Sequence, residues 1–196
     1  MEHLDFILTA LKDRNVASVA PTSFLSVRSI CKRIDRSKPI VLVEYGPGTG
    51  AFTRHLKKRL HPDSVIIAIE LNTQFADRLS RFALEKRRTG AKLTVVQGNA
   101  KDVREILRQN GRESADYVVS GIPFSFLSDQ DKTEIVKQTF NVLSPNGLFL
   151  VYQVTFKMSD YLQKQFPHVR ETKEIFNLPP LCVMEARKPA LTAAIR

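Results

Sequence analysis

Three glycines alternate with other residues between an apolar segment and a helix-like segment. Ile40–Val43 is rich in β-branched residues, as in a buried strand. Gly46, Gly48 and Gly50 then allow a tight turn whose backbone can approach a ligand without side-chain obstruction. The helix predicted over Ala51–Leu60 begins at this turn, and the N–H groups at a helix N-terminus favour carboxylates and other anions. The pattern predicts a strand–turn–helix unit that binds a ligand through its backbone.

An acidic residue, Glu44, ends the strand just before these glycines. The spacing G-x-G-x-G differs from the G-x-G-x-x-G of dinucleotide sites and from the G-x-x-x-x-G-K-S/T of phosphate loops. A carboxylate at this point repels a pyrophosphate and attracts a ligand with a cationic end. Because S-adenosylmethionine carries both an ammonium and a sulfonium, we predict that it is the ligand. A tight turn without a ligand is the alternative.

Polar groups also follow the next two predicted strands. Glu70 lies 20 residues beyond Gly50, where a carboxylate can accept both ribose hydroxyls, and Leu71 beside it can cover an adenine face. Asn99 and the N–H of Ala100 suit the adenine amino group and a ring nitrogen. Each residue alone can equally be a helix cap, and their recurrence at successive strand ends favours a site. The predicted cofactor-binding residues are Glu44, Gly46, Gly48, Gly50, Glu70, Leu71, Asn99, Ala100 and Ser120.

The fourth predicted strand ends in Ser120–Phe124, where the methyl group and its acceptor should meet. Methyl transfer from a sulfonium is an in-line displacement, so the enzyme mainly aligns a neutral amine and excludes water. We expect Gly121 and Pro123 to bring carbonyls close to the acceptor and Phe124 to form a wall by cation–π attraction. A strand exit with a buried aromatic is the alternative. Tyr45 is the candidate catalytic residue, receiving or relaying the amine proton. The predicted acceptor-binding residues are Gly121, Ile122, Pro123 and Phe124.

Strand and helix patterns alternate after residue 39. The strands are predicted at Ile40–Tyr45, Val65–Glu70, Leu93–Gln97, Tyr117–Ser120 and Leu148–Val154, and the helices at Ala51–Leu60, Phe75–Lys86, Val103–Asn110 and Lys132–Leu143. Such alternation gives a parallel sheet with helices on both faces, and ligands bind beyond the carboxyl ends of its strands. Lys173–Phe176 and Cys182–Arg187 add an antiparallel hairpin. We predict an α/β, Rossmann-like class I methyltransferase fold with a mostly parallel seven-stranded sheet.

Residues 1–38 stand apart from this alternation and form a predicted N-terminal segment, followed by a methyltransferase domain over residues 39–196. A first helix has one apolar face made of Leu4, Ile7, Leu8 and Leu11. A second helix, capped by Thr22 or Ser23, turns inward Phe24, Val27, Ile30, Cys31 and Ile34, and outward Arg28, Lys32 and Arg36. The pair either caps the sheet or lies in a membrane interface with its basic side on anionic headgroups.

The net charge of +10 favours an anionic partner, either nucleic acid or anionic lipid. The excess is in the first half, because residues 1–98 carry 17 Lys and Arg against 9 Asp and Glu. Basic clusters occur at Arg28/Lys32/Arg33/Arg36/Lys38, at Arg54/Lys57/Lys58/Arg59 and at Lys86/Arg87/Arg88. Each cluster alone can be a solvated helix face, whereas the three together favour an anionic surface or polymer.

The remaining composition bears on compartment. Cys31 and Cys182 have no metal-ligand partners near them in sequence, so we expect a reducing compartment and no metal site. No signal segment opens the chain, and no apolar run approaches the roughly 18 residues of a membrane span. We therefore expect a cytoplasmic protein, or one attached peripherally to the inner face of the membrane.

Glu44–Thr53 resembles a pattern shared by ribosomal-RNA adenine dimethyltransferases and bacterial phospholipid N-methyltransferases. The RNA group ends its fourth strand Asn-Leu-Pro-Tyr, whereas this chain has Gly121 and Phe124 in place of the Asn and Tyr. The chain also stops after the predicted sheet, so we expect no C-terminal helical RNA-binding domain.

The phospholipid group is the more similar. The resemblance lies in Ser120–Phe124, Leu143–Gly147, Asn177–Pro180 and Ala20–Ser23. It implies conversion of phosphatidylethanolamine to its methylated forms, with an N-terminal helix on the membrane. Three alternatives stay open: an RNA adenine N6-methyltransferase, a small-molecule methyltransferase, and a lipid- or RNA-binding protein that keeps the fold without turnover.

Overall fold

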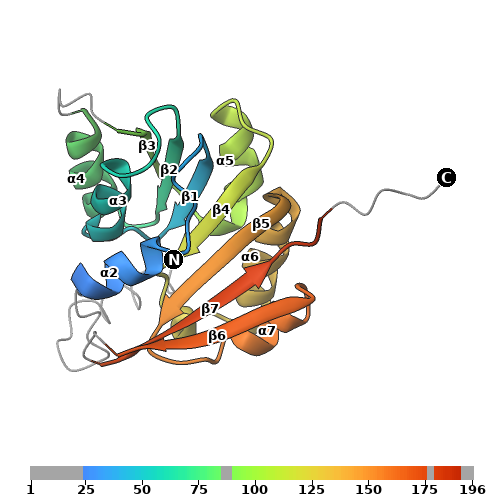
Figure 1. Cartoon of the computed structure of the whole chain (residues 1–196). Helices are drawn as coiled ribbons and strands as arrows, with labels where there is room; N and C mark the ends of the chain where they lie inside the picture. The colour runs from blue at the N-terminus through green and yellow to red at the C-terminus, as the bar shows by residue number, and fades with distance from the viewer. Residues whose placement is uncertain (1–23, 85–89, 176–178, 191–196) are drawn as a thin grey trace.

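A single sheet organises the chain (Figure 1). The structure is a computed structural model that describes residues 24–84, 90–175 and 179–190. Its strands are β1 Val41–Tyr45, β2 Val65–Glu70, β3 Lys92–Gln97, β4 Ala115–Ser120, β5 Leu143–Gln153, β6 His168–Glu174 and β7 Leu181–Arg187. They lie in the order β3-β2-β1-β4-β5-β7-β6, with β7 antiparallel to both β5 and β6 and the other pairs parallel. The predicted seven-stranded, mostly parallel sheet with a terminal hairpin is confirmed.

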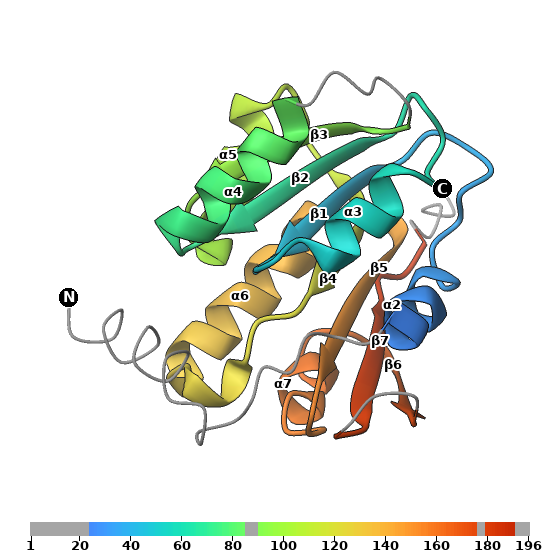
Figure 2. The same ribbon diagram turned by 90° about the vertical axis from the view of Figure 1, so that its left-hand side faces the viewer.

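Helices cover both faces of this sheet (Figure 2). They are α2 Phe24–Cys31, α3 Ala51–Lys57, α4 Thr73–Leu84, α5 Val103–Gln109, α6 Asp129–Val142 and α7 Ser159–Gln163. One apolar cluster joins α2 and α3 to the sheet, and the other joins α5, α6 and the α7 region to the opposite face. Residues of β1 alternate between the two clusters, with Leu42 in one and Val43 in the other, as the side-chain period of a strand requires.

The boundaries differ from the sequence prediction mainly at the C-terminal half. β6 begins at His168, five residues before the predicted Lys173, because this edge strand is largely polar and carries no apolar signal. β5 begins at Leu143, with an irregular register before Leu148. Helix α6 begins at Asp129, where the Ser128 hydroxyl accepts a hydrogen bond from the Asp131 N–H. The short α7 was not predicted.

Helix α2 confirms the predicted division of its sides. Val27, Ile30, Cys31 and Ile34 are all at most 3 % exposed in the cluster between α2, α3 and the sheet. The apolar side of α2 made by these residues is therefore occupied by the sheet, which corrects the interfacial alternative for this side of the helix, whereas the side with Leu25 and Arg28 is exposed. The predicted first helix, with Leu4 to Leu11, lies outside the described residues.

Three expectations drawn from the composition concern the cysteines, the metal ligands and the membrane-spanning helices. Cys31 and Cys182 are both free, buried thiols. Within residues 24–84, 90–175 and 179–190, no three His, Cys, Asp or Glu side chains gather as metal ligands would. No helix in these same ranges combines the length and the apolar composition needed to cross a bilayer.

Arg33, just beyond α2, forms largely buried ion pairs and is not part of a basic surface. Its guanidinium donates to Glu174 Oε1 and Glu185 Oε1, at 2.8 Å each, and to Thr172 Oγ1 at 3.0 Å. The Arg33 side chain is only 18 % exposed, and the side chains of Glu174 and Glu185 are 10 % and 17 % exposed. Arg33 thereby links the segment after α2 to β6 and β7. Because two carboxylates neutralise its charge there, Arg33 is not part of the predicted basic surface cluster.

We expect Arg33→Met to lower the free energy of unfolding by roughly 2–4 kcal/mol, because it leaves two largely buried carboxylates facing each other. Urea denaturation measures the change. Replacing Glu174 and Glu185 by Gln in the same variant should restore most of the loss, since the repulsion is then gone. Arg104→Met, which removes an exposed charge on α5, is the matched control and should change stability little. Equal losses of unfolding free energy in Arg33→Met and Arg104→Met would contradict this stabilising role of Arg33.

Candidate active site

The carboxyl ends of β1, β2 and β4 meet where the strand order reverses. β1 lies between β2 and β4, so the loops after these strands leave on opposite sides and open a crevice. Backbone hydrogen bonds join the strand ends directly: the Gly46 N–H donates to Ile69 O at 2.9 Å, and the Gly121 N–H donates to Tyr45 O at 3.1 Å. The predicted cofactor and acceptor segments therefore adjoin.

The glycine turn needs all three glycines. Gly46, Gly48 and Gly50 have φ values of 62°, 53° and 77°, in the left-handed region that other residues rarely adopt. A Cβ on Gly46 would lie 3.1 Å from Ile122 Cγ1, and one on Gly50 would lie 2.6 Å from Leu79 Cδ1. A Cβ on Gly48 would meet nothing within 4 Å. The turn thus packs closely against neighbouring elements at both ends and faces open space in its middle, where a ligand can reach its backbone.

Glu70 ties the end of β2 to this turn. Its Oε2 accepts a hydrogen bond from the Gly48 N–H at 2.9 Å, and its Oε1 accepts from the Asn72 N–H at 2.9 Å. The carboxylate is held by two backbone donors and still has lone pairs left for ribose hydroxyls. Leu71 follows it, half-buried, beside the same turn.

Glu44 is fully buried, and only one of its two carboxylate oxygens has a hydrogen-bond partner among the described residues. Its Oε2 accepts a hydrogen bond from Thr53 Oγ1 on α3 at 2.6 Å, whereas Oε1 has no hydrogen-bond partner among the described residues. Burial raises the pKa of this carboxyl to about 7; the Thr53 hydrogen bond opposes the rise and the charge of Glu70 adds to it. An orphaned carboxylate oxygen beside a glycine turn fits a ligand with a cationic group. The residues present therefore fit S-adenosylmethionine.

The end of β3 confirms the helix-cap alternative for Asn99. Asn99 Oδ1 accepts from the Lys101 N–H at 3.0 Å and caps the 3₁₀ helix η1, Ala100–Asp102. An amide oxygen has two lone pairs, so this cap does not prevent a second hydrogen bond to an adenine amino group. The Gly98 N–H donates to Glu70 O at 3.0 Å, which holds this segment beside the residue predicted to bind the ribose. The predicted roles of Asn99 and Ala100 stay predictions.

Tyr152, at the end of β5, is a site residue that the sequence did not single out. A Cβ on Gly121 would lie 2.5 Å from the Tyr152 hydroxyl oxygen, so the phenol occupies the space that a side chain would need. Its ring stacks on Phe52 at 5.8 Å between centroids. Burial, and then the Glu44 charge, raise the pKa of the phenol, which keeps its proton. The signal available in sequence was a tyrosine at the carboxyl end of a strand, which alone is weak.

Two predicted side chains lie in the core instead of the crevice. Phe124, in the 3₁₀ helix η2 Phe124–Phe126, is 1 % exposed and belongs to the cluster with α5 and α6. It therefore does not form a wall of an open acceptor pocket in this structure, and the buried-aromatic alternative holds. Ser120 is also buried, and its hydroxyl accepts from the Ile122 N–H at 3.3 Å. Ile122 and Pro123 remain half-exposed beside the glycine turn.

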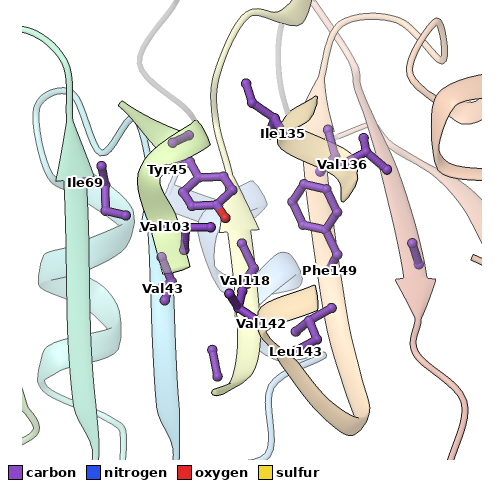
Figure 3. Packing of buried hydrophobic residues seen from close by; sticks show 14 of the residues in the cluster. Val43, Tyr45, Ile69, Val103, Val118, Ile135, Val136, Val142, Leu143 and Phe149 are labelled. Atoms are coloured by element: carbon purple, nitrogen blue, oxygen red, sulfur yellow. The ribbon is translucent and has the colours of Figure 1, made fainter. Parts of the chain in front are cut away.

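Tyr45 is a packing residue. Figure 3 shows its ring among Val103, Val118 and Phe149. Because successive side chains of a strand alternate between the two faces, Tyr45 lies on the sheet face opposite to Glu44. The side chain is fully buried, and its hydroxyl shares a 3.1 Å hydrogen bond with Thr139 Oγ1 of α6. Burial raises the pKa of the phenol. This placement withdraws Tyr45 as the acceptor of the amine proton.

Comparison with known proteins agrees with this geometry. Residues 42–147, more than half of the chain, match a family described as "Methyltransferase domain". The chain is 32 % identical over 166 residues to the ornithine lipid N-methyltransferase of Singulisphaera acidiphila, covering 84 % of each protein.

Solved structures share the fold at low identity. The 1,6-didemethyltoxoflavin-N1-methyltransferase of Burkholderia thailandensis, solved with S-adenosylhomocysteine, superposes with a TM-score of 0.69 at 14 % identity, over 96 % of this chain and 87 % of that one. The precorrin-6y C5,15-methyltransferase of Geobacter metallireducens gives a TM-score of 0.67 at 17 % identity, over 90 % and 95 %. The chain therefore belongs to the methyltransferase-domain family and is an S-adenosylmethionine-dependent class I methyltransferase similar to a lipid N-methyltransferase.

Proposed function

We propose that this enzyme transfers a methyl group to the amine headgroup of a membrane lipid. The observation that carries the proposal is the 32 % identity to an ornithine lipid N-methyltransferase, which extends over 84 % of both chains. An identity spread over nearly the whole chain covers the acceptor segment as well as the glycine turn. The proposal therefore rests on more than the cofactor site that all methyltransferases of this fold share.

The strand ends supply groups that can bind the cofactor and position the amine. Bound S-adenosylmethionine would provide an electrophilic methyl group, held by the glycine turn, Glu44 and Glu70. Gly121 and Pro123 present backbone at the adjoining end of β4, and Tyr152 fills the space behind Gly121. In an in-line displacement these residues position the amine and exclude water. Because the Tyr152 phenol keeps its proton, it does not act as a base, and its oxygen can accept an N–H of the amine while the nitrogen lone pair stays free for the methyl group.

Two headgroups are candidates for the acceptor. The segment Ser120–Phe124 resembles that of phospholipid methyltransferases, which favours phosphatidylethanolamine. The similar curated enzyme acts on an ornithine lipid. Both headgroups carry a primary amine on a lipid anchor, and both would bring the enzyme to a membrane from the cytoplasmic side as a peripheral protein. Leu25, which is 53 % exposed on α2, and the net charge of +10 support contact with an anionic bilayer.

We expect labelled methyl groups from S-adenosylmethionine to enter lipid when the full chain is mixed with vesicles containing phosphatidylethanolamine or ornithine lipid. Thin-layer separation of the extracted lipids identifies which headgroup is methylated. The acceptor with the higher kcat/KM is the assigned substrate.

The control is Glu70→Gln, which replaces the carboxylate expected to accept the ribose hydroxyls and should remove the transfer to either lipid. Ribosomal RNA is included as a third acceptor. Label in RNA and in neither lipid would overturn the proposal and favour the RNA adenine methyltransferase alternative. Cofactor binding without transfer to any acceptor would favour a protein that has lost turnover.

A further inference from the structure

A basic cavity of about 240 Å³ lies between α2 and α3, and none of the predicted cofactor residues is among those that line it. Its walls combine the α2 segment with the C-terminal half of α3, two regions that the sequence shows as separate basic clusters. The lining residues are Arg28, Cys31, Lys32, Arg36, His55 and Arg59. Folding thus gathers four cationic side chains around one concave space.

The four cations lack acidic partners in the part of the chain that the structure describes. No ion pair found within residues 24–84, 90–175 and 179–190 involves Arg28, Lys32, Arg36 or Arg59. Arg33, their neighbour in sequence, instead forms ion pairs with Glu174 and Glu185. Four like charges around a small space repel one another, and an anion in that space relieves the repulsion.

The floor of the cavity is partly desolvated, which strengthens the attraction for an anion. Cys31 is 2 % exposed and His55 is 7 % exposed. Arg59 Nη1 lies 3.3 Å from His55 Nδ1 and donates to the His55 carbonyl at 3.4 Å. Burial lowers the pKa of His55, and the charges of Arg59, Arg36 and Arg28 lower it further. The imidazole therefore lies in a positive potential set by the same arginines.

We propose that this cavity is a binding site for a phosphate group. One planar guanidinium group can bind two phosphate oxygens at once through short, charge-assisted hydrogen bonds. A volume of about 240 Å³ holds a phosphate with a few attached atoms. A bound single-stranded nucleic acid requires an extended basic groove with several aromatic stacking platforms, whereas the described residues that line this cavity include no Phe, Tyr or Trp. The site is independent of the proposed function, because its occupancy is measured without methyl transfer.

The phosphate can come from a lipid headgroup or from solution. Leu25 and Arg28 are three residues apart on α2 and so lie on one side of it, and the Leu25 side chain is 53 % exposed. An exposed apolar side chain beside cationic side chains is the arrangement by which helices contact anionic membranes. This pairing favours a phospholipid headgroup, and the experiment separates it from free phosphate.

The first arm follows the His55 ring resonance by NMR while inorganic phosphate replaces chloride at constant ionic strength. We expect phosphate to shift the His55 resonance saturably and to raise the pKa of His55, because it offsets the charges of Arg28, Arg36 and Arg59. The double variant Arg28→Gln/Arg36→Gln should bind phosphate at least roughly tenfold more weakly. The matched control Arg81→Gln/Arg104→Gln removes two exposed arginines from α4 and α5 and should bind as the wild type does.

The second arm measures sedimentation with vesicles of phosphatidylcholine containing phosphatidylglycerol. A loss of vesicle binding in Arg28→Gln/Arg36→Gln alone, with unchanged thermal unfolding, assigns the site to a lipid phosphate. A response to inorganic phosphate without a difference in vesicle binding assigns it to free phosphate. No saturable response to either ligand, or an equal loss in both double variants, overturns the proposal. A His55 response to an RNA oligonucleotide alone overturns it in favour of nucleic acid.

Discussion

Replacing Glu44 with Gln is expected to weaken binding of S-adenosylmethionine about 100-fold at pH 8. The buried Oε1 of Glu44 has no partner among the described residues, so the apo protein carries a carboxylate that a cationic ligand can satisfy. Losing a charged hydrogen-bond partner in a buried site costs about 1.5–3 kcal/mol, which corresponds to this change in affinity. Isothermal titration calorimetry on the full chain measures it. An affinity within about threefold of the wild type would contradict the role of Glu44.

The same carboxyl predicts the pH dependence of cofactor binding. Because the pKa of Glu44 is about 7, the group is charged at pH 8 and mostly neutral at pH 6. We expect the affinity of the wild type to fall up to about tenfold for each pH unit below 7. The charged or titratable groups near Glu44 are Glu70, Cys31 and Tyr152, and the last two have raised pKa values that keep them neutral in this window. Glu44→Gln should flatten this dependence between pH 6 and 8.

Stability provides the control that separates a ligand role from a structural one. The folded-state pKa of Glu44 is raised from 4.5 to about 7, so its contribution to stability is full below pH 4.5 and is lost as the pH rises through 7. Ionised Glu44 therefore destabilises the apo protein at pH 8. Glu44→Gln should be at least as stable as the wild type in urea at that pH without cofactor. A variant that loses cofactor affinity and stability together would show that Glu44 is needed for folding.

The fold, and the placement of the predicted cofactor residues at adjoining strand ends, could be predicted from sequence because their signals are local. A buried strand, a glycine turn and a helix follow one another within residues 40–60, and the acidic residues end their strands, so the topology brings them together. The polar edge strand β6 escaped prediction in part because an exposed strand has no apolar period to detect.

The acceptor side could not be predicted with the same success, because burial there depends on distant elements. Tyr45 and Phe124 are adjacent in sequence to site residues, yet each turns toward α6 and its neighbours. Tyr152 enters the site from β5 through the register that pairs Val151 with Ser120. The basic cavity likewise forms only when α2 packs beside α3. Such contacts between segments far apart in the chain leave no local pattern.

Gly121→Ala is expected to lower kcat for methyl transfer about 100-fold while leaving the affinity for S-adenosylmethionine nearly unchanged. Gly121 does not have a positive φ, so its backbone accepts alanine, and the nearest obstacle to a new side chain is Tyr152. The new Cβ would lie 2.5 Å from the Tyr152 hydroxyl oxygen and 2.9 Å from Cζ, so either the phenol or the end of β4 must move. A displacement of about 1 Å at the point where the acceptor is aligned costs about this much in rate.

Tyr152→Phe in the Gly121→Ala background separates the steric cause from a general loss of folding. Removing the hydroxyl eliminates the 2.5 Å contact and leaves the 2.9 Å contact to Cζ, so the double variant should recover part of kcat. Tyr152→Phe alone should change kcat less than Gly121→Ala does, because the phenyl ring still fills the space beside Gly121 and displaces nothing. If Tyr152→Phe alone is fully active and the double variant recovers no kcat, then contact with the Tyr152 hydroxyl is not the reason that position 121 is glycine. Recovery in the double variant would show that packing against Tyr152 is the reason that position 121 is glycine in this chain.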